Sequence, residues 1–184
     1  EVEDILGREP IKPIKSLLSK NVVDKNILVT GAGGSIGSEL SRQIYKLKPK
    51  ILVLYELSEY SLYKIDYELS QMDLNVQVVS VLGSVQHETR LDMIFKKYKI
   101  NTVYHAAAYK HVPMVESNPC AGVYNNIIGT YNLAKQSKLN KVDTFVLIST
   151  DKAVRPSNIM GATKRFSELI LQMFNSEEDC STVF

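Results

Sequence analysis

The sequence predicts an α/β fold in which helices cover both faces of a doubly wound parallel sheet. Short apolar segments alternate with helical patterns along the chain, as expected when crossover helices join parallel strands. One of these segments, Ile51-Leu-Val-Leu-Tyr55, is apolar throughout, which is typical of a strand buried on both faces. A run rich in glycine directly follows the first strand, at the position where such folds bind ligands.

Five strands are expected, and helical periodicity separates them. The strands are predicted at 26–30, 51–55, 76–82, 102–106 and 144–149. Helices are predicted at about 35–47, 58–71, 91–98, 121–139 and 159–175, from apolar residues that recur at helical spacing. The predicted strand order is 3-2-1-4-5. Right-handed crossovers then bring the carboxyl ends of all strands to one edge of the sheet, where ligands bind.

Composition places the chain among globular proteins and limits its partners. Of its 184 residues, 45% are apolar and 23% are charged, which suits one domain with a substantial core. The net charge is only +2, so no electrostatic case for binding nucleic acid arises. Cys120 and Cys180 form neither a disulfide framework nor a metal-ligand spacing, so we expect partly buried, reduced thiols and no metal site. No apolar run approaches the ~18 residues that a membrane span needs.

The residues at both ends indicate that the chain is a piece of a longer protein. Residues 1–25 are polar, carry Pro10 and Pro13, and are interpreted as an arm or linker before a nucleotide-binding domain at 26–184. The last residues, Ser181-Thr-Val-Phe184, are interpreted as a strand just beginning. We therefore expect a domain truncated before a carboxyl-terminal substrate lobe. Little or no turnover is expected from these residues alone.

The run Thr30-Gly-Ala-Gly-Gly-Ser-Ile-Gly37 predicts a dinucleotide site in a Rossmann-like fold. A turn this tight needs positive φ or a missing Cβ, and it lets the backbone approach a pyrophosphate at the positive end of the next helix. A glycine triplet alone is a weak signal, but the preceding strand, the following helix and a later acid all agree with it. The predicted cofactor-binding residues here are Gly31, Gly33, Gly34, Ser35, Ile36 and Gly37.

That acid is Glu56, at the end of the second strand and 19 residues beyond Gly37. Its carboxylate is expected to accept hydrogen bonds from the adenosine ribose and to repel a 2′-phosphate, which favours NAD over NADP. Ser84 and Val85 follow the third strand, where the adenine is expected. An Asp is usual at the position of Ser84, so this is a departure from the pattern.

Three small residues, Ala106, Ala107 and Ala108, end the fourth strand. Their size would let the nicotinamide half of the cofactor pass close to the backbone. The alternative is that they serve close packing alone.

The fifth strand ends in Ser149-Thr-Asp-Lys152, and Lys164 lies on the helix that follows. This layout resembles that of the short-chain dehydrogenases/reductases, in which a Ser or Thr, a Tyr and a Lys four residues after the Tyr oxidise an alcohol. Lys164 occupies the lysine position, but the tyrosine position is Met160, whose thioether cannot accept a proton. A solvated, salt-bridged turn is the alternative interpretation of Thr150 to Lys152.

Three segments together, 31–39, 105–116 and 149–165, closely resemble the bacterial polysaccharide-biosynthesis (CapD-like) dehydratases. These are extended short-chain dehydrogenases that convert UDP-N-acetylglucosamine to its 4-keto-6-deoxy derivative. The similarity runs from about Asp4 to Phe184, and methionine in place of tyrosine resembles the large, membrane-anchored branch. The resemblance implies NAD as cofactor, UDP-N-acetylglucosamine or a related UDP-sugar as substrate, a homo-oligomer, and anchoring at the cytoplasmic face of the inner membrane.

The reaction that the resemblance implies oxidises C4, removes water across C5 and C6, and returns the hydride to C6. Lys152 is then the expected base at C5, and Asp151 the expected acid at the C6 hydroxyl. Thr150 should hydrogen-bond the C4 oxygen, and Lys164 should hold the nicotinamide ribose and add positive field near the alkoxide. Because Met160 cannot act as a base, we expect Asp151 to accept the C4 proton as well.

Three further residues are expected near the substrate. Lys110 and His111, in the loop after the fourth strand, either line the substrate pocket or lie in a solvated loop. Asn126 matches the helix asparagine that organises the active site in this family; without that match it would indicate a local helix kink.

Two other functions remain possible from the sequence. A UDP-sugar 4-epimerase would share the cofactor site, but it relies on tyrosine and has no Asp-Lys pair, so Met160 and Lys152 argue against it. A non-catalytic NAD-binding sensor or scaffold is the other, and the retention of Lys164 beside Thr150-Asp-Lys152 argues against that.

Overall fold

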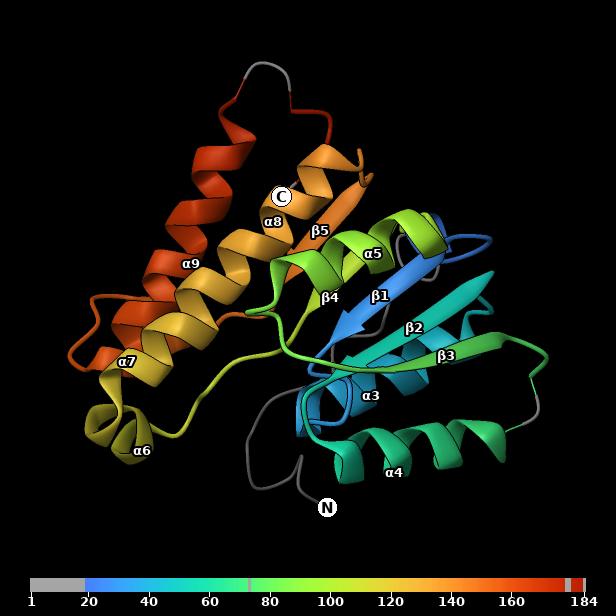
Figure 1. The fold of residues 1–184 in the computed structure, drawn as a ribbon, viewed down its shortest axis with the longest axis horizontal. Helices are drawn as coiled ribbons and strands as arrows, with labels where there is room; N and C mark the ends of the chain where they lie inside the picture. The colour runs from blue at the N-terminus through green and yellow to red at the C-terminus, as the bar shows by residue number, and fades with distance from the viewer. Residues whose placement is uncertain (1–18, 73, 178–179, 184) are drawn as a thin grey trace, which may run out of the picture.

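The computed structural model describes residues 19–72, 74–177 and 180–183. Its centre is a five-stranded sheet in the order β3-β2-β1-β4-β5, in which every pair is parallel. The predicted α/β class and strand order are therefore confirmed (Figure 1). The strands are β1 (Asn26–Thr30), β2 (Ile51–Glu56), β3 (Gln77–Leu82), β4 (Thr102–His105) and β5 (Thr144–Leu147).

The helices of the described residues follow the predicted alternation with differences after β4. They are α3 (Ser35–Lys46), α4 (Glu59–Ser70), α5 (Glu88–Tyr98), α6 (Val112–Ser117), α7 (Pro119–Gly122), η1 (Val123–Ile128), α8 (Gly129–Leu139), η2 (Asp151–Ala153) and α9 (Ile159–Asn175). Helix α6 was not predicted, because six residues beginning Val112-Pro113 are too few to show a helical period. Strand β5 ends at Leu147, two residues earlier than predicted, so Ser149 belongs to the loop before η2.

The long helix predicted at 121–139 is interrupted by the π-helical segment η1. Within this segment the backbone oxygen of Asn126 accepts hydrogen bonds from the hydroxyls of Thr130, at 2.5 Å, and Ser167, at 2.8 Å. Side chains that compete for a helical carbonyl in this way favour a local widening of the helix. The prediction of one regular helix was therefore wrong in its first part, at Val123–Ile128, and confirmed for Gly129–Leu139.

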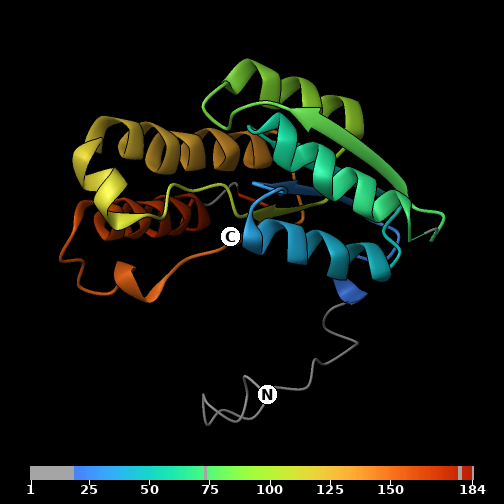
Figure 2. The ribbon, with the colours of Figure 1, turned by 90° about the horizontal axis from the view of Figure 1, so that it is seen from below.

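Two apolar layers sandwich the sheet and hold the domain together. Alternate residues of β1 point to opposite layers: Leu28 packs with α5, α8 and α9, while Ile27 and Val29 pack with α3 and α4. Viewed from below, α5 and α8 lie above the sheet and α3 lies beneath it (Figure 2). Burial on both faces explains why the central strands are apolar at successive positions.

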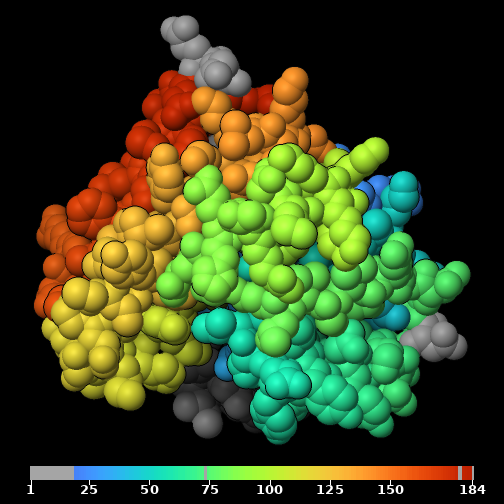
Figure 3. All heavy atoms as spheres, in the orientation of Figure 1, coloured from blue at the N-terminus to red at the C-terminus, as the bar shows by residue number. Residues whose placement is uncertain are grey.

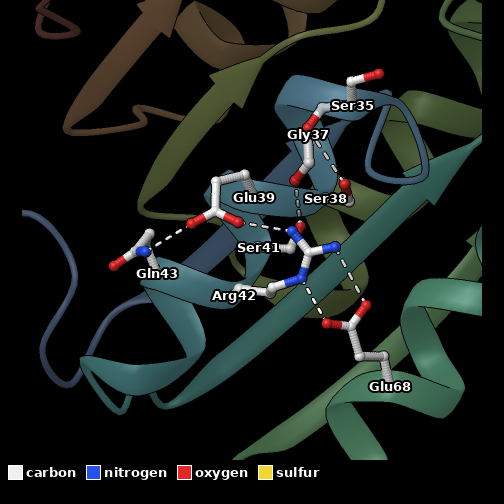
Figure 4. A network of polar contacts seen from close by, with 8 residues as sticks. All are labelled: Ser35, Gly37, Ser38, Glu39, Ser41, Arg42, Gln43 and Glu68. Carbon is white, nitrogen blue, oxygen red and sulfur yellow. Dashed lines mark hydrogen bonds and ion pairs between the residues drawn. The ribbon is translucent and has the colours of Figure 1, made fainter. Parts of the chain in front are cut away.

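A polar contact links α3 to α4 on the outer surface of the second layer. Arg42 donates to both carboxylate oxygens of Glu68, at 2.5 and 3.2 Å, and to Glu39 at 2.7 Å (Figure 4). Exposed ion pairs of this kind add little to stability because solvent screens them. The apolar layers therefore hold the two helices against the sheet, and the ion pairs add a surface contact between them.

The ends of the described chain pack against the domain. Val22 is buried with the α3–α4 layer, so the last part of the predicted arm lies on the core; residues 1–18 fall outside the described residues. Val183 pairs in parallel with Thr144, and its carbonyl accepts from Phe145 N at 2.8 Å, as the predicted strand start requires. Phe184 is not among the described residues.

Two smaller points concern the cysteines and the membrane. Both cysteines are free, and Cys180 is partly buried as expected, but Cys120 is exposed. Cys120 lies in the four-residue helix α7, and its side chain is accessible to solvent. Among the described residues, no helix combines the length and apolarity that crossing a bilayer would require.

Candidate active site

Three adjoining hollows lie along the carboxyl edge of the sheet. The first, called here the groove, runs past the turn after β1 and the ends of β2 and β3; it is lined by Gly31, Gly34, Tyr55, Glu56, Leu57, Ser61, Gly83, Ser84, Val85, Ala106, Ala107, Ala108, Tyr109 and Asn125. The second, called the edge pocket, is lined by Ile36, Ala106, Ala108, Lys110, Ile148, Ser149, Thr150, Lys152, Met160 and Lys164. The groove and the edge pocket share Ala106 and Ala108 in their linings, so they adjoin each other at these residues.

The third hollow, called the side pocket, lies against α6 and contains Lys110 and His111. It shares Ala108 and Tyr109 with the groove and Lys110 with the edge pocket. Figure 3 shows the surface notched between α4 (teal) and the segment from α6 to α7 (yellow), on either side of the groove. The sequence predicted that its unusual residues gather at this edge of the sheet. The linings of the three hollows are consistent with that prediction.

The glycine turn (residues 31–34) joins β1 to α3, and a side chain at its first residue would be strained and would clash. Gly31 has φ +66°, and a Cβ on it would lie 2.7 Å from the nitrogen of Ala107. A Cβ on Gly37 would lie 1.9 Å from the carbonyl oxygen of Gly31. These two glycines are thus required by contacts of the chain with itself. Gly34 lines the groove and precedes α3 without a side chain to cap it, which leaves N–H groups available to an anionic ligand.

Glu56 links the glycine turn to the loop after β2. One carboxylate oxygen accepts a hydrogen bond from Gly33 N at 2.9 Å, and the other accepts from Leu57 N and Ser58 N at 2.9 and 3.0 Å. These bonds hold a negative charge at the wall of the groove, where the ribose contact was predicted. The sequence did not suggest that the same carboxylate also orders the turn.

The far end of the groove is built by β3 and the loop behind it. The Ser84 hydroxyl accepts from Gln86 N at 3.2 Å, and the Ser84 carbonyl accepts from the hydroxyl of Tyr55 at 2.7 Å. Burial raises the pKa of Tyr55 to about 12, so this phenol stays a donor. Val85 is buried behind this wall against Gly129. Tyr55 is a groove residue that the sequence analysis took only as part of an apolar strand.

Thr150 and Asp151 form a hydrogen-bonded pair at the end of β5. The Thr150 hydroxyl donates to Asp151 Oδ1 at 2.9 Å, and Lys152 Nζ lies 3.5 Å from the same oxygen. The hydrogen bond from Thr150, and then the charge of Lys152, lower the pKa of Asp151 below its usual value. The Asp151 side chain is 88% exposed, so in this chain it is an ionised carboxylate beside the edge pocket.

Met160 and Lys164 enter the edge pocket from the first turns of α9. Both are buried, at 2% and 6% exposure, and Lys164 Nζ donates to the carbonyl of Ile148 at 2.7 Å. Burial lowers the pKa of Lys164 to about 8, and the nearby Glu168 opposes that shift. The thioether therefore occupies the predicted tyrosine position with the lysine one helical turn away.

The remaining predicted residues separate into exposed and buried ones. Lys110 and His111 are exposed and line the side pocket, and Lys110 also lines the edge pocket. Asn126 is 1% exposed and lies beneath the pockets. Its amide accepts from Tyr109 N at 2.8 Å and donates to Tyr109 O at 3.0 Å and to the Thr163 hydroxyl at 2.9 Å. It thus positions the loop after β4 instead of facing a substrate, and it also lies in the π-helical kink.

Two residues that join these elements were missed by the sequence analysis. Glu116 on α6 accepts a hydrogen bond from Ile159 N at the start of α9, and Glu168 accepts from the Ser149 hydroxyl. Both contacts join segments distant in sequence, so local patterns gave no signal for them.

The sheet order, the glycine turn and the acid at the end of β2 define a nucleotide-binding domain of the Rossmann type. Residues 27–184 match the family model described as "Polysaccharide biosynthesis protein", and the chain belongs to this family. The capsular polysaccharide biosynthesis protein CapD of Staphylococcus aureus is 49% identical over 185 residues, covering 100% of this chain and 31% of the relative. The chain thus spans about a third of the length of this relative.

More distant relatives carry two different activities in their names. A UDP-N-acetylglucosamine 4,6-dehydratase (inverting) of Campylobacter jejuni is 33% identical, covering 83% of this chain and 44% of the relative. A UDP-glucose 4-epimerase of Rickettsia bellii is 32% identical, covering 79% and 42%. The two identities are nearly equal, so these relatives do not favour one of the two named reactions over the other.

Solved structures confirm the fold. Pen from Bacillus thuringiensis superimposes with a TM-score of 0.81 at 32% identity, covering 89% of this chain and 51% of its own. The dTDP-glucose 4,6-dehydratase DesIV of Streptomyces venezuelae, solved with NAD bound, has a TM-score of 0.75 at 20% identity, covering 85% and 53%. The same fold therefore binds NAD in a solved protein.

Proposed function

We propose that this chain is the NAD-binding part of a UDP-N-acetylglucosamine 4,6-dehydratase that serves polysaccharide biosynthesis. One observation carries the proposal: Thr150, Lys152 and Lys164 meet around one pocket that adjoins the glycine-turn groove. A hydroxyl and two amines in this pocket, with a carboxylate beside it, can move the protons that oxidation of an alcohol by NAD and elimination of water require. Met160 in the tyrosine position favours this reaction over 4-epimerisation.

The groups along the groove support binding of NAD there. The N–H groups at the start of α3 suit the pyrophosphate, Glu56 suits the ribose diol, and the wall at Ser84 and Val85 suits the adenine. The small side chains of Ala106 to Ala108 leave room where the groove enters the edge pocket. When bound there, NAD supplies a hydride acceptor that later returns the hydride, so the whole reaction is redox-neutral.

The first step needs a base for the C4 hydroxyl, and the Thr150–Asp151 pair can provide it. As C4 loses its hydride, the proton of the C4 hydroxyl moves to the Thr150 oxygen while the Thr150 proton moves to Asp151 along the 2.9 Å hydrogen bond. Because its pKa is lowered, Asp151 is an ionised carboxylate at neutral pH, so its oxygens are free of a proton when the step begins. Lys164, when protonated, stabilises negative charge on the C4 oxygen during this step.

The elimination uses the two charged groups that follow Thr150. The C4 ketone acidifies the C5 proton, and the Lys152 side chain, in its unprotonated form, is the proposed base that removes it. Asp151, now protonated, gives its proton to the C6 hydroxyl, which leaves as water. Once the hydride has returned to C6, Lys152 gives its proton back to C5. Both side chains finish as they began, so one carboxylate serves two steps and the tyrosine is dispensable.

A product assay on the full-length protein tests this function. Incubation with UDP-N-acetylglucosamine and NAD should yield the 4-keto-6-deoxy sugar and one water. The 4-epimer as product would instead favour the epimerase, and an unchanged sugar together with tight NAD binding would favour a non-catalytic protein. Mass spectrometry and NMR of the sugar distinguish the three results.

We further propose that the full-length protein is a homo-oligomer anchored at the cytoplasmic face of the inner membrane. The support is the likeness of the segments around Met160 to the membrane-anchored branch of these dehydratases. Cell fractionation of the full-length protein, followed by detergent extraction and light scattering, tests both parts. Recovery in the soluble fraction as a monomer would refute them.

A further inference from the structure

A buried histidine connects the residue before the glycine turn to helix α9 through hydrogen bonds. His105 is the last residue of β4 and is 1% exposed, with its ring edge-on to Phe145. Its Nδ1 lies 2.7 Å from the hydroxyl of Thr30, and its Nε2 lies 3.0 Å from the hydroxyl of Thr130. Both ring nitrogens are therefore satisfied by side chains from other elements, which is what a buried imidazole requires.

The neighbouring acceptor assigns the proton on the ring. The Thr130 hydroxyl lies 2.5 Å from the carbonyl oxygen of Asn126, which can only accept, so Thr130 donates there. The Thr130 oxygen must then accept from Nε2–H of His105. The other nitrogen, Nδ1, is unprotonated and accepts from the Thr30 hydroxyl. Burial, and then the charge of Lys164, lower the pKa of His105 to about 3, so the ring is neutral and carries one proton, as this assignment needs.

The Nδ1 side of the ring leads to the cofactor groove. Thr30 ends β1 and immediately precedes Gly31, whose positive φ starts the glycine turn. The Ala107 N–H also points to the Thr30 hydroxyl, at 3.5 Å. Loss of this hydroxyl would therefore remove a side-chain contact between β4 and the residue that precedes the glycine turn.

The Nε2 side of the ring leads to the catalytic helix α9. Thr130 holds the carbonyl of Asn126, and the same carbonyl accepts from Ser167 on α9 at 2.8 Å. The amide of Asn126 also donates to Thr163, which directly precedes Lys164. The π-helical turn and the lysine helix are thus held together at one carbonyl that His105 reaches through Thr130.

We propose that His105 is a positioning residue: its single Nε2–H tautomer sets the glycine turn and the lysine helix at a fixed distance across the sheet. The inference rests on the proposed function, because it assigns one end of the network to NAD binding and the other to hydride transfer. It concerns a residue that touches neither ligand, since the side chain is enclosed by protein on all sides.

Two amide substitutions separate the two ends in the full-length protein. Asparagine places an oxygen near the Nδ1 position and can keep the bond to Thr30, while it loses Thr130. Glutamine places an NH₂ group near the Nε2 position and can keep the bond to Thr130, while it loses Thr30. The matched control is Ser137→Ala, which removes a buried hydroxyl that donates within α8, to the carbonyl of Leu133, and makes no other bond to the described residues.

The two variants are expected to differ in which quantity falls, NAD affinity or the rate of hydride transfer. H105Q should weaken NAD binding about tenfold, and H105N should slow single-turnover NADH formation at saturating NAD about tenfold, as for one lost buried hydrogen bond. Thr30→Val should reproduce the first effect and Thr130→Val the second. Ser137→Ala should change neither. NAD affinity is measured by calorimetry and hydride transfer by absorbance at the NADH band.

Equal losses of NAD affinity and of hydride transfer in both variants would overturn the proposal, because a purely structural residue acts on both alike. If the variants do not fold, ¹⁵N NMR of the wild-type ring decides: a protonated Nδ1 would also overturn it. If the wild type binds NAD but forms no 4-keto sugar, the proposed function fails. The affinity split between H105Q and H105N still tests the cofactor end of the network.

Discussion

The carboxylate of Glu116 accepts a hydrogen bond from the backbone N–H of Ile159 at 2.6 Å, and so joins α6 to the first residue of α9. The first N–H groups of a helix lack partners within the helix, and a negative charge near them is favourable. The side pocket lies against α6, and Met160 and Lys164 lie on α9. This contact therefore links the predicted substrate loop to the catalytic helix.

Removal of this contact should displace the start of α9 without unfolding the domain. Glu116→Ala is expected to lower the melting temperature by only about 2 °C, since the bond is at the surface. It should slow single-turnover NADH formation more than it weakens NAD binding, because Glu56 and the glycine turn are untouched. Glu116→Gln keeps an acceptor oxygen, so its rate of NADH formation should lie between those of the wild type and of Glu116→Ala. Identical rates for all three proteins would contradict the link.

Glu56 is expected to select NAD over NADP. Its carboxylate is held by three backbone N–H groups at the groove wall, where a 2′-phosphate would meet a fixed like charge. Titration of the full-length protein should give at least about tenfold tighter binding of NAD, and Glu56→Gln should reduce that ratio. Equal or tighter binding of NADP by the wild type would remove Glu56 from this role.

Asp151 is expected to act in both oxidation and elimination. Asp151→Asn should slow NADH formation and water loss together, by roughly 10²–10⁴ for a lost acid–base group. Thr150→Val, which breaks the relay but keeps volume, should slow mainly NADH formation. Met160→Leu keeps a buried apolar side chain and should cost far less. Single-turnover absorbance combined with C5 deuterium exchange resolves the steps. Normal reduction of NAD by Asp151→Asn would show that another base operates.

Lys152 should be needed only after NADH has formed. Lys152→Met removes the base at C5 and is expected to block exchange of the C5 proton while some NADH still appears. The same single-turnover experiment in deuterated solvent measures both quantities. Complete loss of NADH formation in this variant would place Lys152 in the oxidation step instead.

The charge of Lys164 should set the alkaline limit of hydride transfer. The pKa of this buried amine is lowered to about 8, so the positive field at the edge pocket disappears as pH rises through 8. Single-turnover NADH formation should fall over that range. Lys164→Arg keeps its charge at alkaline pH and should remove the inflection, although its larger head group slows the reaction. A rate that stays constant from pH 7 to 9.5 in the wild type would contradict this assignment.

Acid should destabilise the domain through His105. Its folded pKa of about 3 lies below the ordinary value of 6.5, so between these pH values the unfolded chain binds one more proton. The free energy of unfolding should fall as pH decreases from 6.5 towards 3, by at most about 1.4 kcal/mol per pH unit from this residue. H105Q should be less stable at pH 7 but lose less on acidification. Parallel pH dependences in urea unfolding would show that His105 titrates normally.

The sequence by itself determined the class of the fold, the strand order and the positions of the chemical groups. Apolar runs and helical periods are local, and crossover handedness then allows few arrangements of the strands. The glycine turn, Glu56 and the segment from Thr150 to Lys164 were identified because each follows a strand, and parallel strands end at one edge. These predictions needed no knowledge of which side chains meet.

Tertiary structure alone decided which side chains meet and which are enclosed. His105 contacts Thr30 and Thr130, which are 75 and 25 residues away, and Glu116 reaches Ile159, 43 residues away. No local pattern encodes such contacts. The π-helical turn likewise depends on hydroxyls from α8 and α9 that compete for one carbonyl, and Asn126 is buried only because α9 packs over it. A hydrogen bond depends on distance in space, which the chain acquires only when its layers pack.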